Sequence, residues 1–409
     1  MTKRLILAFV FLSWHLVACS NGDSGISSGL PDKPSAEEDS PGTETISEEM
    51  RVKITGEDLY ISAKLDAKTD ILYWFKKCMF NELFTFYRVG TIDNNMPAPA
   101  TLPDASPTSL LNLAYSDNIG PFNITGYGWC GGNHPYLDEV TQTARNIGYR
   151  IYIDGKEIKT DLSTLTKEIK IEVINEIMNP SKADTSSGKT LLNEILCIET
   201  VNYSIYRNNI QVLVTHEFQN ESPVTVQMYY GMQSMFDKET HTLTANGKYV
   251  DWTVQKDVST FTKKEYPSFR RFIEKSANVY QSSYLFADGL GNHEEISDDD
   301  IIFIGNSSNK TYHKIIADRE HKKGDIIHWS GVYTWFKSPV SDDDDLLCYE
   351  GVIDNKKVLF IDCKKSVDRT IQLPVNYTKK SFTIIEKSKS ITITGNKVTA
   401  KGLKIVSDG

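Results

Sequence analysis

Ile210 to Tyr230 reads I-Q-V-L-V-T-H-E-F-Q-N-E-S-P-V-T-V-Q-M-Y-Y, and this stretch decides the fold class. Apolar and polar side chains alternate from Ile210 to Phe218, and a second apolar-rich run extends from Val224 to Tyr230. Alternation of this kind is typical of β-strands with one buried face. Asn220-Glu221-Ser222-Pro223 joins the two runs with residues that favour turns. The stretch therefore predicts two successive strands joined by a tight connection.

Similar runs continue along most of the chain, with turn residues between them. This succession predicts an all-β fold, a large antiparallel β-sandwich with few short helices, over residues 51–409. Residues from about 340 to 409 are a candidate smaller C-terminal β subdomain. Pro267 to Ala277 is the one modest helix that the pattern predicts. The strand-like runs include Asp58 to Leu65, Ile71 to Phe75, Leu83 to Val89, Gly148 to Asp154, Glu168 to Ile177, Leu191 to Tyr206, Val279 to Phe286, Tyr312 to Ala317 and Ile326 to Phe336.

A family resemblance rests on Val214 to Val226, V-T-H-E-F-Q-N-E-S-P-V-T-V. This strand, "N-x-S/T-P" turn and second strand, within one β body of this length, resemble the galactose-mutarotase-type supersandwich. That fold occurs in epimerases and in domains of polysaccharide lyases and glycosidases. The resemblance implies fold more than activity. Of the family's histidine and carboxylate pair, His216 is the candidate histidine.

The N-terminus has the features of a secretory signal. Lys3 and Arg4 precede the apolar run from Leu5 to Leu12, which is too short to span a bilayer. Leu16-Val17-Ala18-Cys19 resembles the bacterial lipobox. The resemblance implies a lipoprotein signal peptide over residues 1–18, cleavage before Cys19, and lipid on the thiol and new amine of Cys19. The alternative is an ordinary secreted protein with a chance cysteine after the cleavage site.

Residues 19–50 predict an acidic, flexible tether. The segment is rich in Ser, Gly, Pro, Asp and Glu, and Lys33 is its only basic residue. It has too little apolar surface to fold alone. We therefore expect a protein of the bacterial cell envelope, held to a membrane by lipid at Cys19, with the outer membrane favoured.

Charge and composition narrow the partners. The formal net charge of −9 argues against nucleic acid, because phosphate binding needs a basic face. Twenty Tyr, seventeen Phe and six Trp suit both a β core and stacking on sugar rings. The sequence thus favours a carbohydrate ligand over a nucleic acid.

Neither the cysteines nor the acidic runs predict a metal. Five cysteines remain after Cys19, and they lack the CxxC spacing of zinc sites. Cys348 and Cys363 lie in two strand-like runs, so a hairpin disulfide requires that they fall opposite each other. Asp298 to Asp300 and Asp342 to Asp345 lack the ligand spacing of a calcium loop, which favours solvated loops. We expect no cofactor.

Tyr115 to Tyr136 is a glycine-hinged aromatic loop with five glycines and two prolines. Glycine lets backbone and ligand approach closely, which suits the mouth of a pocket. The predicted ligand-binding residues are Tyr127, Trp129, Asn133 and Tyr136. The alternative is a structural loop whose aromatics cap the core.

Four residues are candidates for catalysis. His134 follows a glycine turn, which predicts exposure, whereas His216 shares a strand face with apolar residues, which favours a core histidine. Arg145 could neutralise a uronate, although a surface arginine that supports a strand is as well supported. Tyr230 ends a strand. A tyrosine, a histidine and an arginine together suit proton abstraction beside a uronate.

Three functions remain open. Residues 51–409 lack the G-x-S-x-G elbow, the P-loop and the H-E-x-x-H motif. The first function is a glycan-binding lipoprotein, the second a lyase or epimerase, and the third a non-catalytic interaction subunit of the envelope. A cleft that joins His134, His216, Arg145 and Tyr230 favours the enzyme. An exposed aromatic platform favours the binder.

Overall fold

The computed structural model describes residues 46–100, 109–112, 120–235, 241–243, 249–251, 259–261, 271–276, 278–286, 302–305, 310–364, 367–372, 384–385 and 391–400. All of them belong to the second of two units, residues 44–409. Cys19, the signal peptide and the tether up to residue 45 lie outside the described residues, as do Tyr115 to Ile119 of the aromatic loop and Asp298 to Asp300.

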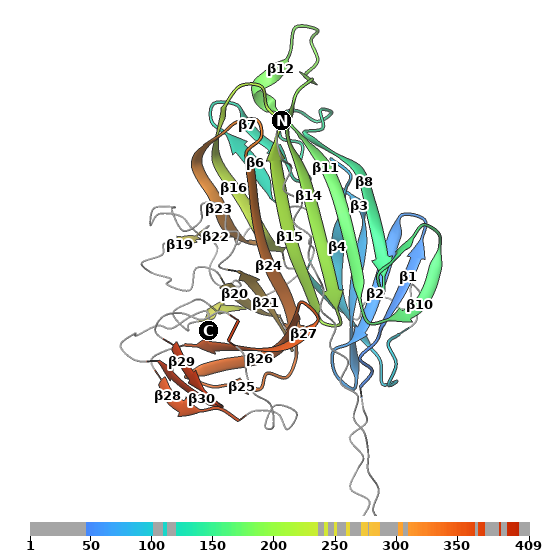
Figure 1. The fold of residues 1–409 in the computed structure, drawn as a ribbon, viewed down its shortest axis with the longest axis vertical. Helices are drawn as coiled ribbons and strands as arrows, with labels where there is room; N and C mark the ends of the chain where they lie inside the picture. The colour runs from blue at the N-terminus through green and yellow to red at the C-terminus, as the bar shows by residue number, and fades with distance from the viewer. Residues whose placement is uncertain are drawn as a thin grey trace, which may run out of the picture. The chain divides into compact units, whose positions relative to one another are not determined.

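The described residues form an antiparallel β fold, which confirms the predicted class (Figure 1). Their only helical element is a short 3-10 turn at Pro180–Lys182. Among them, no helix is long and apolar enough to cross a membrane. Six strands form sheet I, in the order β10 (Leu162–Thr166), β1 (Met50–Thr55), β2 (Asp58–Lys64), β3 (Thr69–Cys78), β4 (Leu83–Asp93) and β5 (Ser109–Asn112).

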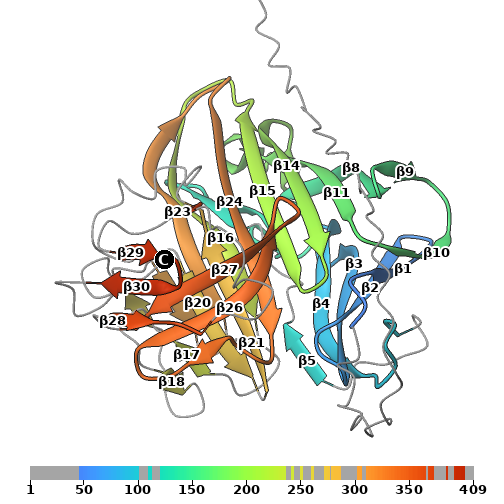
Figure 2. The same cartoon turned by 60° about the horizontal axis from the view of Figure 1, so that its bottom comes forward.

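Sheet II has ten strands, and sheet III has six. Figures 1 and 2 both show β14, β15 and β24 of sheet II running side by side. The order in sheet II is β18 (Tyr249–Asp251), β17 (His241–Leu243), β20 (Arg271–Ser276), β21 (Val279–Leu285), β24 (Ile326–Phe336), β15 (Asn209–Phe218), β14 (Ile195–Tyr206), β11 (Ile169–Met178), β8 (Ala144–Ile153) and β9 (Lys156–Ile158). In sheet III it is β19 (Ser259–Phe261), β22 (Ile302–Gly305), β23 (Lys310–His321), β16 (Val224–Met235), β6 (Pro121–Ile124) and β7 (Gly128–Gly131).

Smaller sheets complete the described fold. Ala183–Asp184 (β12) pairs with Leu191–Leu192 (β13). The C-terminal strands form two three-stranded sheets. Their members are β25 (Ser341–Asp342), β26 (Leu346–Ile353) and β27 (Lys356–Cys363), and then β28 (Val367–Thr370), β30 (Lys397–Ala400) and β29 (Ile391–Thr394).

Sheets I and III pack on the same face of sheet II. From sheet I, Phe75 contacts Tyr203 with ring centroids 5.4 Å apart. From sheet III, Phe122 contacts Phe218 at 6.1 Å. Tyr203 lies opposite Val212 in the β14–β15 register, and side chains at opposite positions share a face. Val212 and Phe218 both occur on the inner face of β15, because alternate residues of a strand point the same way. One extended apolar cluster therefore joins all three sheets.

β15 and β16, the two strands of the Ile210 to Tyr230 stretch, belong to different sheets. β15 pairs with β14 and β24, whereas β16 pairs with β6 and β23. The connection between them is a corner of the sandwich rather than a hairpin. Asn220 is buried there and donates from Nδ2 to the carbonyl oxygens of Ser222 at 2.8 Å and His321 at 3.1 Å. These bonds hold the chain as it crosses from sheet II to sheet III.

One prediction was wrong, and one condition was not met. The helix predicted at Pro267 to Ala277 is contradicted by strand β20, which pairs with β17 on one side and β21 on the other. Pairing on both edges outweighs local helix propensity, which is a weak preference. The disulfide condition also fails, because Cys348 lies opposite Ile361 and Cys363 opposite Leu346. Both cysteines are thiols buried in a small C-terminal apolar cluster.

The C-terminal strands have packing of their own. Leu346, Cys348, Ile361, Ile391 and Val398 belong to a cluster separate from the large one. A further cluster stacks Tyr349 of β26 on Phe336 of β24 at 4.4 Å. The boundary of the smaller subdomain stays a prediction. The acidic run after Val340 is partly ion-paired, since the Asp343 carboxylate binds the Arg369 guanidinium at 2.6 Å.

Candidate functional site

The aromatic loop predicted from the sequence folds into a hairpin of β6 and β7. Phe122 lies opposite Cys130, and both side chains are buried in the core. Asn123 lies opposite Trp129, so the Trp129 indole belongs to the other, outer face of sheet III. The turn between the strands carries Tyr127, which is 54% exposed.

A close backbone contact fixes this hairpin against β16. Gly120 has φ +74°, and a Cβ atom there would lie 1.4 Å from the carbonyl oxygen of Tyr230. Only glycine has no side chain to meet that oxygen, and glycine adopts positive φ without strain. Gly120 therefore determines how closely the start of the hairpin approaches Tyr230.

Adjacent tyrosines of β16 face opposite sides of sheet III. The Tyr229 side chain is fully buried, whereas Tyr230 is half-buried on the outer face. The Tyr230 ring stacks on Trp129 with centroids 6.0 Å apart and planes 19° apart. On its other side it contacts Tyr312 of β23 at 5.1 Å. Three strands thus bring three aromatic side chains together.

The chain after β7 extends this arrangement. Tyr136 stacks on Trp129 with a centroid distance of 6.1 Å, and His134 meets the Tyr136 ring edge-on at 5.7 Å. We call His134, Tyr136, Trp129, Tyr230 and Tyr312 the aromatic row. All five side chains are half-buried. Each therefore keeps part of its ring surface accessible while packing holds its orientation.

Buried asparagines anchor the turn before the row. Asn133 is only 1% exposed, and its Oδ1 accepts a bond of 3.4 Å from the Leu83 amide. Asn81 donates from Nδ2 to the carbonyl oxygen of Gly132 at 2.7 Å and accepts from the Thr143 amide at 3.1 Å. Asn133 thus differs from the expected ligand contact, because its side chain lies inside the protein. Its hydrogen bond to the Leu83 amide helps to fix the turn that precedes the row.

His216 lies in the core, as its strand face indicated. Its exposed fraction is 0%, and Nε2 lies 2.9 Å from Oε2 of Glu199, which is also buried. Glu199 accepts a second bond of 2.9 Å from Nδ2 of Asn175. Phe122 and Tyr229 enclose the imidazole edge-on, each at 4.9 Å. Burial raises the pKa of Tyr229, reinforced by the Glu199 charge, so this phenol stays protonated.

Arg145 is the second residue of β8. Its guanidinium forms an ion pair with Glu176, its partner in the β8–β11 register, and its side chain is 58% exposed. This pair matches the supporting role that was the alternative for Arg145. Of the four catalytic candidates, the structure therefore brings only Tyr230 and His134 together, in the row. His216 lies inside the core, and Arg145 forms an ion pair with a carboxylate.

The row includes one residue that the sequence analysis did not single out. Tyr312 begins a predicted strand, but its contact with Tyr230 depends on a β16–β23 register that shifts between Tyr229 and Tyr230. Asn81 was missed because a lone loop asparagine carries no signal. Among the described residues, no cluster of His, Cys, Asp and Glu is arranged to hold a metal ion. Chemically, the row offers stacking area with a histidine at one end.

No family model matches the sequence, and no curated protein matches it. Solved structures with a similar arrangement include a GH36 alpha-galactosidase from Geobacillus stearothermophilus, at 9% identity over 71% of this chain and 41% of that chain, TM-score 0.40. The galactosidase domain of an alpha-galactosidase-sucrose kinase has 9% identity over 69% and 41%, TM-score 0.38. A glycoside hydrolase family 97 enzyme from Pseudoalteromonas sp. strain K8 has 7% identity over 69% and 35%, TM-score 0.33.

This chain spans about two fifths of the length of the two galactosidases. Similarity at these identities and scores carries no argument about activity.

Proposed function

We propose that this protein binds carbohydrate at the cell envelope, with the aromatic row as its stacking surface. The observation that carries the proposal is the joining of Trp129, Tyr136, Tyr230 and Tyr312 on one outer face of sheet III. Tyrosine and tryptophan supply rigid, amphipathic contact area, with a polar tip for hydrogen bonds. The flat apolar faces of sugar rings suit such a surface.

The same observations weigh against a lyase or epimerase built from the four catalytic candidates. His216 is enclosed by Phe122, Tyr229 and Glu199, so it cannot reach a ligand on the outer face. Arg145 is engaged by Glu176. Binding needs only the row, whereas proton abstraction needs a base and a charge-neutralising group beside the same sugar.

A lipid anchor at Cys19 forms the second part of the proposal, and it rests on the sequence alone. Membrane fractionation of the wild type and Cys19→Ala tests it. We expect Cys19→Ala to remain unprocessed or to leave the membrane fraction. An unaltered N-terminal mass and unchanged fractionation would contradict a lipoprotein.

A glycan array probed with the full chain tests the binding role, and a product-release screen on the retained glycans tests catalysis. We expect retention of at least one glycan without release of product. Trp129→Ala and Tyr230→Ala should lose retention, whereas Tyr152→Ala, which removes a half-buried tyrosine from β8, should keep it. No retained glycan would favour an interaction subunit, and released product would favour an enzyme.

A further inference from the structure

A second aromatic cluster occupies the outer face of sheet I. Tyr60 of β2 stacks on Trp74 of β3 with centroids 5.2 Å and planes 27° apart. Tyr87 of β4 meets the same indole edge-on at 5.0 Å. All three side chains are half-buried, so their rings keep accessible area.

A bulge in β4 produces this cluster. Trp74 lies opposite Arg88, whereas Phe75 lies opposite Phe86, so Tyr87 is an extra residue in the ladder. A bulge of this kind re-aims side chains locally. Tyr87 and Arg88 are consecutive, yet both contact Trp74. Regular alternation would send one of them into the core.

Two cations accompany the rings. Lys76 Nζ lies 4.6 Å from the Trp74 centroid and 4.3 Å from that of Tyr87. The Arg88 guanidinium lies 4.8 Å from the Tyr87 centroid. Neither cation forms an ion pair with a residue that the structure describes, whereas the neighbouring Lys77 pairs with Glu57 at 3.0 Å. One carboxylate, that of Asp58, lies at the cluster, where it accepts from Trp74 Nε1 at 2.8 Å. Two cations against one carboxylate leave the local charge positive in a chain of net charge −9.

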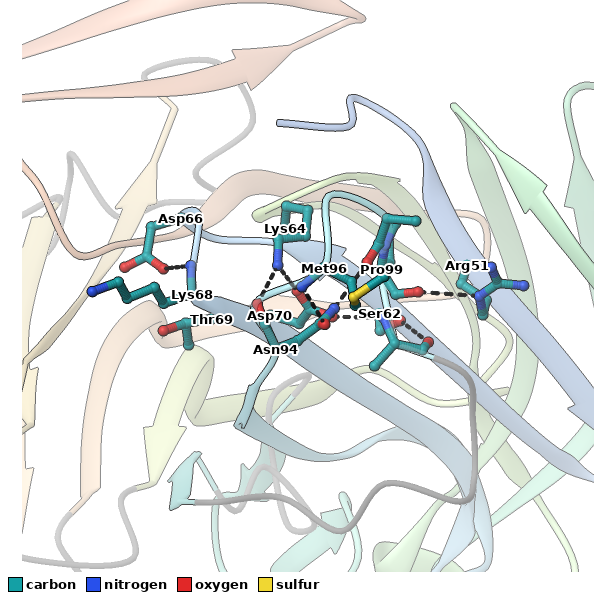
Figure 3. Close-up of polar contacts among 12 residues, drawn as sticks. Arg51, Ser62, Lys64, Asp66, Lys68, Thr69, Asp70, Asn94, Met96 and Pro99 are labelled. Carbon is teal, nitrogen blue, oxygen red and sulfur yellow. Dashed lines mark hydrogen bonds and ion pairs between the residues drawn. The ribbon is translucent and has the colours of Figure 1, made fainter. Parts of the chain in front are cut away.

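A buried polar network links β2, β3 and the segment after β4 in the same sheet (Figure 3). The figure shows Lys64, Asp70 and Asn94 pointing toward one another from β2, β3 and the segment after β4. Lys64 Nζ lies 2.9 Å from Asp70 Oδ1 and donates to the Asn94 carbonyl oxygen at 2.6 Å. Asp70 Oδ2 accepts from Asn94 Nδ2 at 2.7 Å and from the Ala100 amide at 2.6 Å.

The network is linked to Tyr60 through Ala100, whose amide it holds. Ala100 and Tyr60 pack together against Leu72 and Ile92. Trp74 is fixed in turn, because its Nε1 donates to Asp58 Oδ1 at 2.8 Å. The rings are therefore held in place before a ligand arrives, which lowers the entropy lost on binding.

We propose that Tyr60, Trp74, Tyr87, Lys76 and Arg88 form a separate binding site for an acidic sugar, one that carries a carboxylate or a sulfate. The proposal rests on the proposed function only in taking carbohydrate as the ligand class. The rings supply stacking area, and the two cations supply charge complementarity for the acidic group. An anionic lipid surface has complementary charge too, but two tyrosine rings fixed around one indole fit a single sugar ring better.

Titration calorimetry of the full chain with trigalacturonic acid and with its methyl ester tests the site, because the ester keeps the sugar rings and removes the charge. We expect the acid to bind at least about tenfold more tightly than the ester at low salt, with a smaller difference at high salt. Lys76→Gln should weaken acid binding several-fold, and Lys76→Gln/Arg88→Gln should remove the preference. Lys77→Gln, the matched control, should leave it unchanged.

Three results with the acid would overturn the proposal: no binding by the wild type up to about 10 mM, equal affinity for acid and ester, or an unchanged preference in the double variant. A fourth would come from vesicles with anionic lipid. If they bind the wild type while the acid does not, and the double variant loses vesicle binding, the cluster binds a lipid surface instead. Trp129→Ala separates this site from the aromatic row. Acid binding retained in Trp129→Ala and lost in the double variant supports the proposal. The reverse pattern would place the acid at the row and overturn this site while keeping the proposed function.

Discussion

Tyr229 and Tyr230 are neighbours on one strand, but they belong to two different regions. Tyr229 lies in the inner region, where its hydroxyl accepts a bond of 2.9 Å from Trp329 Nε1 and its ring stacks on Phe122 at 4.5 Å. Tyr230 lies in the outer region, between Trp129 and Tyr312. The inner rings enclose His216 and its carboxylate partner. The outer rings are left half-buried.

This contrast shows that residue type alone does not distinguish a core from a binding surface. Both regions contain tyrosines, a tryptophan and a histidine. They differ in their burial, because sheet II packs on the inner face of sheet III and covers the inner region. A substitution in the inner region should therefore reduce stability, and one in the outer region should reduce binding.

Stability should be most sensitive to substitution at Gly120, where the backbone closely approaches the Tyr230 carbonyl oxygen. Gly120→Ala places a Cβ atom 1.4 Å from the Tyr230 carbonyl oxygen, so we expect a loss of more than about 4 kcal/mol in the free energy of unfolding. Gly126→Ala is the control, because its φ of +81° is also positive but no atom lies within 4 Å of a Cβ there. That control should cost about 1–2 kcal/mol. Urea denaturation measures both, and equal effects would contradict the close approach.

His216→Leu should cause the next largest loss in the free energy of unfolding. It leaves the buried Glu199 carboxylate without its imidazole partner, and a buried charged group left unsatisfied costs more than a neutral one, for which the cost is about 1–3 kcal/mol. His134→Ala in the outer region should change stability by less than about 0.5 kcal/mol. Chemical denaturation compares the two histidines. Similar small effects from both would show that His216 is not part of the core.

Tyr229→Phe should have a smaller effect. The change leaves the buried Trp329 Nε1 donor without its acceptor, which costs about 1–3 kcal/mol. Tyr230→Phe keeps the stacking ring on the outer face, so its effect on stability should stay within about 0.5 kcal/mol. Thermal melts of the two variants separate the faces. A larger loss for Tyr230→Phe would reverse the assignment.

His321 predicts a modest pH dependence for the inner region. Its imidazole stacks on Phe218 at 4.3 Å. Burial, together with Arg319 and His216 and against Asp325, lowers its pKa to about 4 from the usual 6.5. Below about pH 6.5 the unfolded chain takes up a proton that the folded chain refuses until about pH 4, so stability falls as the pH falls through this window.

Between about pH 7 and 5.5 the loss from His321 should be about 1 kcal/mol. His321→Phe should remove that part of the slope, which denaturation at several pH values measures. A slope that is the same in the wild type and in His321→Phe would contradict the lowered pKa.

Much of the sandwich could be predicted from the sequence, because alternation in strands such as Ile210 to Phe218 reports directly on burial. The burial of His216 followed from the same alternation. The aromatic row could be predicted only in pieces. Trp129, His134 and Tyr136 were singled out from one loop, but Tyr230 was placed in a different group, because its contact with Trp129 depends on the pairing of β6 with β16.

Features set by register were beyond the sequence. The bulge at Tyr87 interrupts a run that reads as a regular strand, and only the partner strand shows that Trp74 faces Arg88. β20 read as a helix because both neighbours that make it a strand, β17 and β21, lie outside that segment. Long-range pairing outweighed the local pattern in both places.

Affinity and melting temperature measured together on Tyr229→Ala and Tyr230→Ala test the division between the regions most directly. For a glycan retained by the full chain, Tyr230→Ala should bind at least about tenfold more weakly, with a melting temperature close to that of the wild type. Tyr229→Ala should lose about 3–5 kcal/mol of stability, because it removes a fully buried ring. Wild-type affinity in Tyr230→Ala, or unfolding of that variant, would contradict a binding surface on the outer face of sheet III.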